Sequence, residues 1–79
     1  MRITVDISMY PLTESYIGPI KKFIEAINSN PDIEVMTNKV STQLLGEHSV
    51  IMPLITDEMV RVFDSIRASF VIKIIKGKD

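Results

Sequence analysis

Hydrophobic and polar residues alternate over the first ten positions of the chain. The hydrophobic set shares one side of an extended strand and consists of Ile3, Val5, Ile7 and Met9. We expect a strand from Ile3 to Met9 that ends at Pro11, because proline has no N–H to donate to a neighbouring strand. One face of this strand then packs in the core, and the opposite face carries Thr4, Asp6, Ser8 and Tyr10.

A helical period replaces the alternation further along the chain. Hydrophobic residues recur at spacings of three and four and define one buried stripe on Ile17, Ile20, Phe23, Ile24 and Ile27. We expect Ser15 to be the N-cap, because this start places Pro19 in the first turn, where a missing N–H costs little. The polar run from Asn28 to Asp32 ends the helix.

Two short strands are expected in the middle of the chain. The first runs from Ile33 to Thr37, and the second runs from Val40 to Leu45 and ends at Gly46. We expect a tight turn between them at Asn38-Lys39 or one residue away. The second strand is unusual because hydroxyl and amide side chains, namely Ser41, Thr42 and Gln43, stand where branched aliphatic residues are favoured.

A second helical region leads from Gly46–Ser49 to about Arg67. Its hydrophobic stripe consists of Ile55, Met59, Val62, Phe63 and Ile66. Two starts fit the pattern: Pro53 in a first turn that follows Ser49, or an irregular lead-in and a regular helix capped at Thr56. A last strand follows from Ser69 to Ile75. Its core side carries Phe70, Ile72 and Ile74, and its other side carries Val71, Lys73 and Ile75.

The order strand, helix, strand, strand, helix, strand predicts one α+β domain over residues 1–79. Two βαβ halves in this order are typical of the ferredoxin-like βαββαβ fold, a four-stranded antiparallel sheet with two helices on one face. The other face remains uncovered and mixes polar with hydrophobic residues, among them Leu45, Val71 and Ile75. We therefore expect a homodimer or homotetramer assembled through this open sheet face.

Composition narrows the classes of function. The 79 residues are 46% hydrophobic and 24% charged, which is typical of one folded domain. The chain has no cysteine and one histidine, His48, which excludes a disulfide framework, a thiolate metal site and a two-histidine zinc site within one chain. We expect no metal and no cofactor.

Charge and hydropathy set the expected compartment and partners. The net charge is −1, so no basic field attracts nucleic acid, and aromatic residues that would stack on RNA bases are scarce on the predicted sheet. Hydrophobic runs are shorter than the roughly 20 residues that cross a membrane, and the N-terminus alternates instead of forming a signal segment. We expect a soluble cytoplasmic protein without nucleic-acid or membrane partners.

Catalytic groups are sparse. Asp6 in mid-strand and His48 after the third strand are the candidate titrating residues, and no triad spacing or glycine-rich phosphate loop accompanies them. Asp6 is more readily explained as an ion-pair partner of Lys73 or as an interface residue. We therefore expect a protein that is not an enzyme.

Neutral hydrogen-bonding side chains are the remaining candidate chemistry. In the predicted fold the first and third strands are neighbours, so side chains at their ends and at the helix entry converge at one end of the sheet. Such groups beside an aromatic wall suit a flat polar heterocycle, and they equally suit helix capping and an interface. The candidate ligand-binding residues are Ser8, Tyr10, Ser15, Tyr16, Ser41, Thr42 and Gln43.

These same residues resemble the thiamine-binding YkoF-like family. The resemblance is carried by Ile7-Ser8-Met9-Tyr10-Pro11-Leu12, by Ser15-Tyr16-Ile17 with Ile20, and by Val40-Ser41-Thr42-Gln43-Leu44-Leu45-Gly46-Glu47. It extends over essentially the whole chain, as a version with a single repeat. It implies a ferredoxin-like domain that forms dimers or tetramers and binds thiamine or its hydroxymethylpyrimidine half without turnover, for carriage or sensing.

The resemblance also implies roles for particular side chains. Tyr10 or Tyr16 would pack on the ring of the ligand. The hydroxyl groups of Ser15, Ser41 and Thr42 would bond its ring nitrogens or its exocyclic amine. The alternative function is an oligomeric structural or regulatory domain without a small-molecule ligand.

Overall fold

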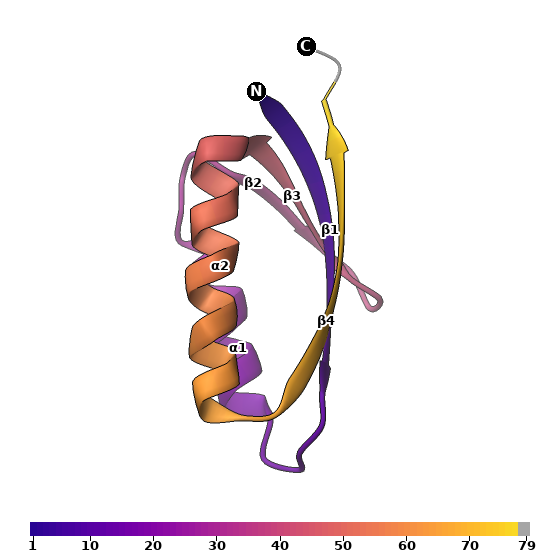
Figure 1. Cartoon of the computed structure of the whole chain (residues 1–79), viewed down its shortest axis with the longest axis vertical. Helices are drawn as coiled ribbons and strands as arrows, with labels where there is room; N and C mark the ends of the chain where they lie inside the picture. The colour runs from indigo at the N-terminus through magenta and orange to yellow at the C-terminus, as the bar shows by residue number, and fades with distance from the viewer. Residues whose placement is uncertain (78–79) are drawn as a thin grey trace.

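The computed structural model describes residues 1–77, which form a sheet with two helices packed on one side of it (Figure 1). The element order is the predicted one, and the fold is the ferredoxin-like α+β fold. The elements are β1 (Arg2–Pro11), α1 (Ile17–Asn28), β2 (Glu34–Thr37), β3 (Thr42–Glu47), α2 (His48–Ser65) and β4 (Ala68–Lys76).

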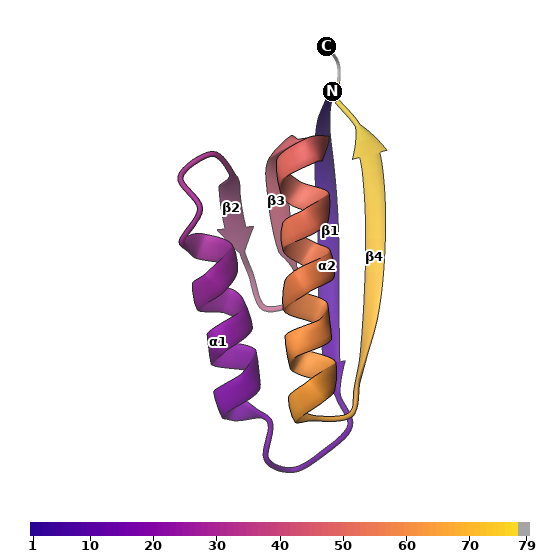
Figure 2. The ribbon, with the colours of Figure 1, turned by 60° about the vertical axis from the view of Figure 1, so that its left-hand side comes forward.

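The sheet is antiparallel throughout, with the strand order β2-β3-β1-β4. The two long strands β1 and β4 pair along nine positions, from Ile3 with Lys76 to Pro11 with Ala68. Figure 2 shows α1 and α2 side by side on the same face of this sheet. We call the opposite face the open face; side-chain alternation places on it Thr4, Asp6, Ser8, Tyr10, Gln43, Leu45, Val71, Lys73 and Ile75.

The core lies between the sheet and the helices. Alternate residues of β1 and β3 point toward the helices and are buried, as the pattern of β1 predicts. Both helices add the residues of their hydrophobic stripes, and burial of this apolar surface is the main favourable term in folding. The buried hydrophobic residues are Ile3, Val5, Ile7, Phe23, Ile27, Ile33, Leu44, Ile51, Ile55 and Val62.

The first helix begins one residue later than predicted. Tyr16, not Ser15, is the N-cap, and its carbonyl accepts the first helical hydrogen bond from the N–H of Ile20 at 3.1 Å. A start at Ser15 would require the corresponding bond from Pro19, which has no N–H. The prediction that Ile17 belongs to the buried stripe is also wrong, because this first helical residue is 73% exposed.

Both predicted starts of the second helix are wrong. The helix is regular from His48, so Pro53 lies inside it, and Thr56 is an interior residue whose hydroxyl donates to the carbonyl of Met52 at 2.8 Å. At this start, the N–H of His48, which has no partner within the helix, donates to the carbonyl of Met1 at 2.8 Å. Strand β3 therefore runs straight into the helix.

The connection between β2 and β3 is longer than the predicted tight turn. Val40 and Ser41 belong to this connection and not to the strand, which begins at Thr42. The reason is Asn38, whose side-chain Oδ1 accepts the N–H groups of Val40 at 2.7 Å and Ser41 at 2.9 Å. We refer to residues 38–41 as the β2–β3 turn.

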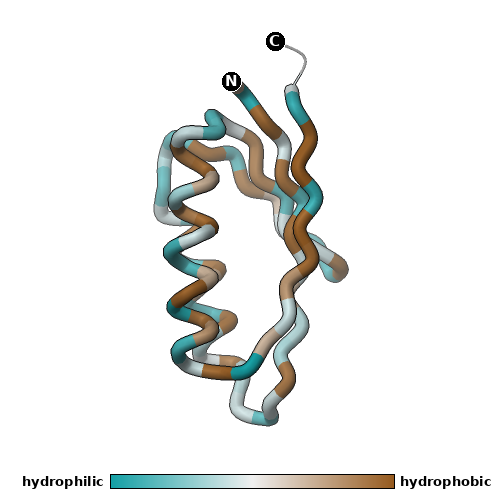
Figure 3. The backbone as a smooth tube through the Cα atoms, viewed as in Figure 1, coloured by the Kyte–Doolittle hydropathy of each residue, from teal (hydrophilic) through white to brown (hydrophobic). Residues whose placement is uncertain are grey.

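The end of β4 is less buried than predicted. Ile74 lies on the helix side of the sheet but is 48% exposed, because β4 is an edge strand. Figure 3 shows hydrophobic residues continuing along β4 toward its end. Among the described residues, neither helix combines the length and the hydrophobicity that crossing a membrane requires.

Candidate ligand-binding site

A hollow of about 300 Å³ lies where β1 extends past the end of β3. The pairing of β1 with β3 ends at Ile7 and Thr42, whereas β1 stays paired with β4 as far as Pro11. The space beside this unpaired edge is bounded by α1 and by the β2–β3 turn. Its lining residues are Ile7, Ser8, Met9, Ile20, Phe23, Ile24, Thr37, Asn38, Lys39, Val40, Ser41 and Thr42.

The hollow joins an apolar wall to a group of hydroxyls. The wall comes from Ile20, Phe23 and Ile24 of α1, which follow one another at helical spacing. The hydroxyl-bearing residues Ser8, Ser41 and Thr42 come from β1, the turn and β3. A surface of this kind suits a flat molecule with apolar faces and polar edges.

The β2–β3 turn holds its shape through Asn38. Besides the two bonds to its side chain, its own N–H donates to the carbonyl of Ser41 at 3.0 Å, which closes the turn. A single side-chain bond connects the turn to β1: the hydroxyl of Ser8 donates to the carbonyl of Val40 at 3.3 Å. That bond is long for an O–H donor, so Ser8 can exchange it for a ligand at small cost.

The structure separates the other four candidate residues from this hollow. Tyr10 is 51% exposed on the open face, and Tyr16 is 41% exposed at the N-cap of α1. Ser15 is exposed in the loop before α1, and Gln43 lies on the open face opposite Asp6. The hollow therefore gathers Ser8, Ser41 and Thr42 and none of the tyrosines, so its aromatic residue is Phe23.

The site predicted from the sequence lacks Asn38 and Lys39, because the residue types there indicate only a tight turn. The asparagine at the turn was a usable signal, since asparagine side chains often hold the backbone two residues on. Ile20, Phe23 and Ile24 were recognised as a hydrophobic stripe. Nothing in their spacing distinguishes a stripe that is packed along its full length from one that also walls a hollow.

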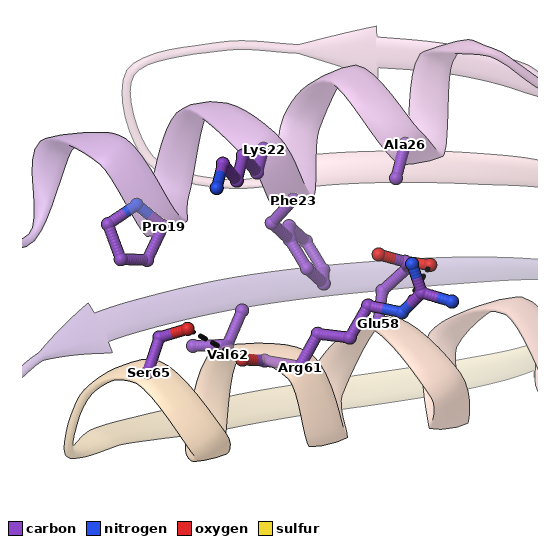
Figure 4. A pocket seen from close by; sticks show the side chains of 8 residues that line it. All are labelled: Pro19, Lys22, Phe23, Ala26, Glu58, Arg61, Val62 and Ser65. Atoms are coloured by element: carbon purple, nitrogen blue, oxygen red, sulfur yellow. Dashed lines mark hydrogen bonds and ion pairs between the residues drawn. The ribbon is translucent and has the colours of Figure 1, made fainter.

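A second hollow of about 260 Å³ lies between the two helices (Figure 4). Three of its polar residues interact with one another: Arg61 pairs with Glu58 at 3.6 Å, and the Ser65 hydroxyl donates to the Arg61 carbonyl at 3.1 Å. It contains none of the seven candidate residues. Its lining consists of Pro19, Lys22, Phe23, Ala26, Glu58, Arg61, Val62 and Ser65.

Asp6 marks the centre of the open face. Its direct neighbours across the sheet are Gln43 on β3 and Lys73 on β4. One carboxylate oxygen, Oδ1, is buried and has no hydrogen-bond partner among the described residues, and no ion pair forms there with Lys73. A buried carboxylate oxygen without a donor costs free energy, so Asp6 is an energetically unfavourable residue of the sheet.

No family model matches the sequence, and no curated protein sequence matches it significantly. The fold is shared with several solved structures. A hypothetical protein from Methanocaldococcus jannaschii is 27% identical with a TM-score of 0.81, the alignment covering 99% of this chain and 82% of that one. A candidate thiamine biosynthesis/salvage protein from Thermotoga maritima is 21% identical with a TM-score of 0.82, the alignment covering 98% of this chain and 85% of that one. A Streptococcus pneumoniae protein is 17% identical with a TM-score of 0.87, the alignment covering 99% of this chain and 89% of that one.

Proposed function

We propose that this protein binds thiamine or its hydroxymethylpyrimidine half, without catalysis, in the hollow beside the unpaired edge of β1. The observation that carries the proposal is the meeting of three hydroxyl-bearing residues, Ser8, Ser41 and Thr42, with the apolar wall of α1. The fold shared with the Thermotoga maritima protein supports this choice of ligand.

The chemistry of the pyrimidine matches the lining. An aminopyrimidine has two apolar faces, ring nitrogens that accept hydrogen bonds and an exocyclic amine that donates them. Hydroxyl groups both donate and accept, so Ser8, Ser41 and Thr42 can satisfy either kind of atom. The ring faces would pack against Ile20 and Ile24, which are half-buried, with Phe23 behind them in the core. A volume near 300 Å³ is at the small end for ligand sites and suits one ring better than two.

A binding role without turnover is consistent with the groups around the hollow. Among the described residues that line it, Lys39 is the one with an ionisable side chain. A general acid and base pair is therefore not assembled there. The role we propose is carriage or sensing of the vitamin or its precursor.

Isothermal titration of the purified protein with thiamine and with hydroxymethylpyrimidine tests the proposal. We expect saturable heat with at least one of them and a loss of at least tenfold in affinity for Ser41→Ala combined with Thr42→Val, because two hydrogen bonds disappear. The valine keeps the shape of Thr42, which is 6% exposed. Ser49→Ala, an exposed hydroxyl in α2 outside the hollow, is the matched control and should bind normally.

Two results contradict the proposal. Absence of heat with both compounds, at protein concentrations well above micromolar, would favour the alternative of a structural or regulatory oligomer without a ligand. Undiminished binding by the double variant would place the ligand elsewhere in the molecule.

We also propose that two copies of the chain pack through their open faces. Val71 and Ile75 are 51% and 62% exposed there. Asp6 and Lys73 are side by side on this face, so a twofold-related copy can place its lysine over the carboxylate and receive the same contact in return. Homodimers, or tetramers built from them, follow from this contact.

A further inference from the structure

The described lining of the hollow contains one positively charged side chain and no negatively charged one. Lys39 stands in the β2–β3 turn and is exposed to solvent at the rim. Among the described residues that line the hollow there is no carboxylate to balance it. The described lining therefore carries one positive charge and no counter-charge for a positively charged ligand.

We infer that the site selects pyrimidines that carry a phosphate group, over the neutral pyrimidine and over cationic thiamine. This inference rests on the proposed function, since it assigns the ligand class of the same hollow. Thiamine brings a permanent positive charge in its thiazolium ring, which would meet Lys39 without a counter-charge. A pyrimidine monophosphate brings negative charge to the same position.

The donors at the rim suit a phosphate. The Lys39 ammonium supplies up to three N–H donors on a flexible stem, and Ser8 and Ser41 are further lining residues that carry hydroxyl groups. A hydrogen bond between an ammonium and a phosphate is charge-assisted and stronger than one between neutral groups. The apolar wall on α1 remains free for the ring, so one ligand can use both ends of the hollow.

The backbone of the turn makes Lys39 the decisive group. Turns often bind phosphate through free backbone N–H groups. Here the N–H groups of Val40 and Ser41 already donate to the Asn38 side chain at 2.7 and 2.9 Å. These two N–H groups are therefore already used within the turn, and the charged side chain of Lys39 is the strongest donor that the lining offers to an anion.

Titration calorimetry at low ionic strength tests this inference with three probes: hydroxymethylpyrimidine, hydroxymethylpyrimidine phosphate and thiamine. We expect the phosphate to bind about fivefold to tenfold more tightly than the neutral pyrimidine, and thiamine to bind most weakly, because Lys39 is exposed and its field is partly screened. Lys39→Gln should make the phosphate and the neutral pyrimidine equal. Lys21→Gln, an exposed lysine of α1 outside the hollow with the same change in net charge, should keep the preference.

The outcomes separate this inference from the proposed function. Binding of thiamine at least as tight as that of the phosphate, or a preference that persists in Lys39→Gln, overturns the selection by charge and leaves the pyrimidine site standing. Absence of binding by all three probes overturns both. A preference lost equally in Lys21→Gln would reduce the effect to net charge and would also overturn the role of Lys39.

Discussion

At the scale of single residues, Gly46 shows how tightly the end of β3 is packed. A Cβ atom built on it would lie 3.3 Å from the carbonyl oxygen of Asp32 and 3.4 Å from Cδ1 of Ile51. The first neighbour is backbone, which cannot move away as a side chain can. Glycine is therefore favoured here by close approach and not by a special backbone angle, since the described glycines have no positive φ.

Gly46→Ala should lower the free energy of unfolding by about 1–3 kcal/mol, because the added methyl overpacks the junction of β3 and α2. Urea unfolding followed by circular dichroism measures the change. Gly18→Ala is the matched control, since a Cβ there meets nothing within 4 Å. It should stabilise by up to about 1 kcal/mol through helix propensity. Equal stability of Gly46→Ala and the parent would refute the close packing.

The prediction of residue roles succeeded where a strand was already certain. Ile3, Val5 and Ile7 are buried as the alternation of β1 predicts. It failed for Ile17, because helical spacing states which side of the helix a residue occupies and not whether the helix has yet reached the core. The sequence pattern likewise does not show which candidate residues share one site: Ser8 and Ser41 line the hollow, and Tyr16 does not.

At the scale of elements, each helix contains one proline, and the two prolines occupy different positions in their helices. Pro19 occupies the third position of α1, where an N–H would have no helical partner in any case. Pro53 occupies the sixth position of α2, so the carbonyl of Ser49 has no N–H to accept from at that point. The similar Ser-x-x-x-Pro segments at the two helix entries therefore have different structures.

Exchange of each proline for alanine should have effects of opposite sign. Pro53→Ala restores one helical hydrogen bond in α2 and should raise the free energy of unfolding by about 1–2 kcal/mol. Pro19→Ala restores none, and it should lower this free energy by up to about 1 kcal/mol because the unfolded chain gains freedom. Thermal and urea unfolding of both variants give the comparison. A destabilised Pro53→Ala would show that α2 depends on the proline.

At the scale of the whole molecule, the sheet has one face covered by helices and one without cover in the described chain (Figure 1). On the open face, the polar residues of β1 lie between hydrophobic residues of its two neighbouring strands, β3 and β4. Leu45 is half-buried on β3, whereas Val71 and Ile75 are exposed on β4. An exposed surface of this composition is typical of an interface between proteins.

Val71→Glu should shift the mass measured by light scattering after gel filtration from an oligomer to a monomer, because a carboxylate would be buried in the contact. Val60→Glu is a close control: Val60 is also 51% exposed, but it lies on α2. It should leave the mass unchanged. An oligomer that survives Val71→Glu, or a parent protein that is monomeric at all concentrations, would exclude assembly through the open face.

The sequence by itself determined the element order, the core face of β1 and the class of fold, because these depend on periodicity along the chain. The tertiary structure decided what depends on contacts between distant segments. Strand register ends the pairing of β1 with β3 at Ile7 and Thr42 and so opens the hollow. Side-chain bonds of Asn38 lengthen the turn and place Lys39 at its rim. Periodicity contains no information on where two strands cease to pair, and for this reason the site could be seen only once the chain was folded.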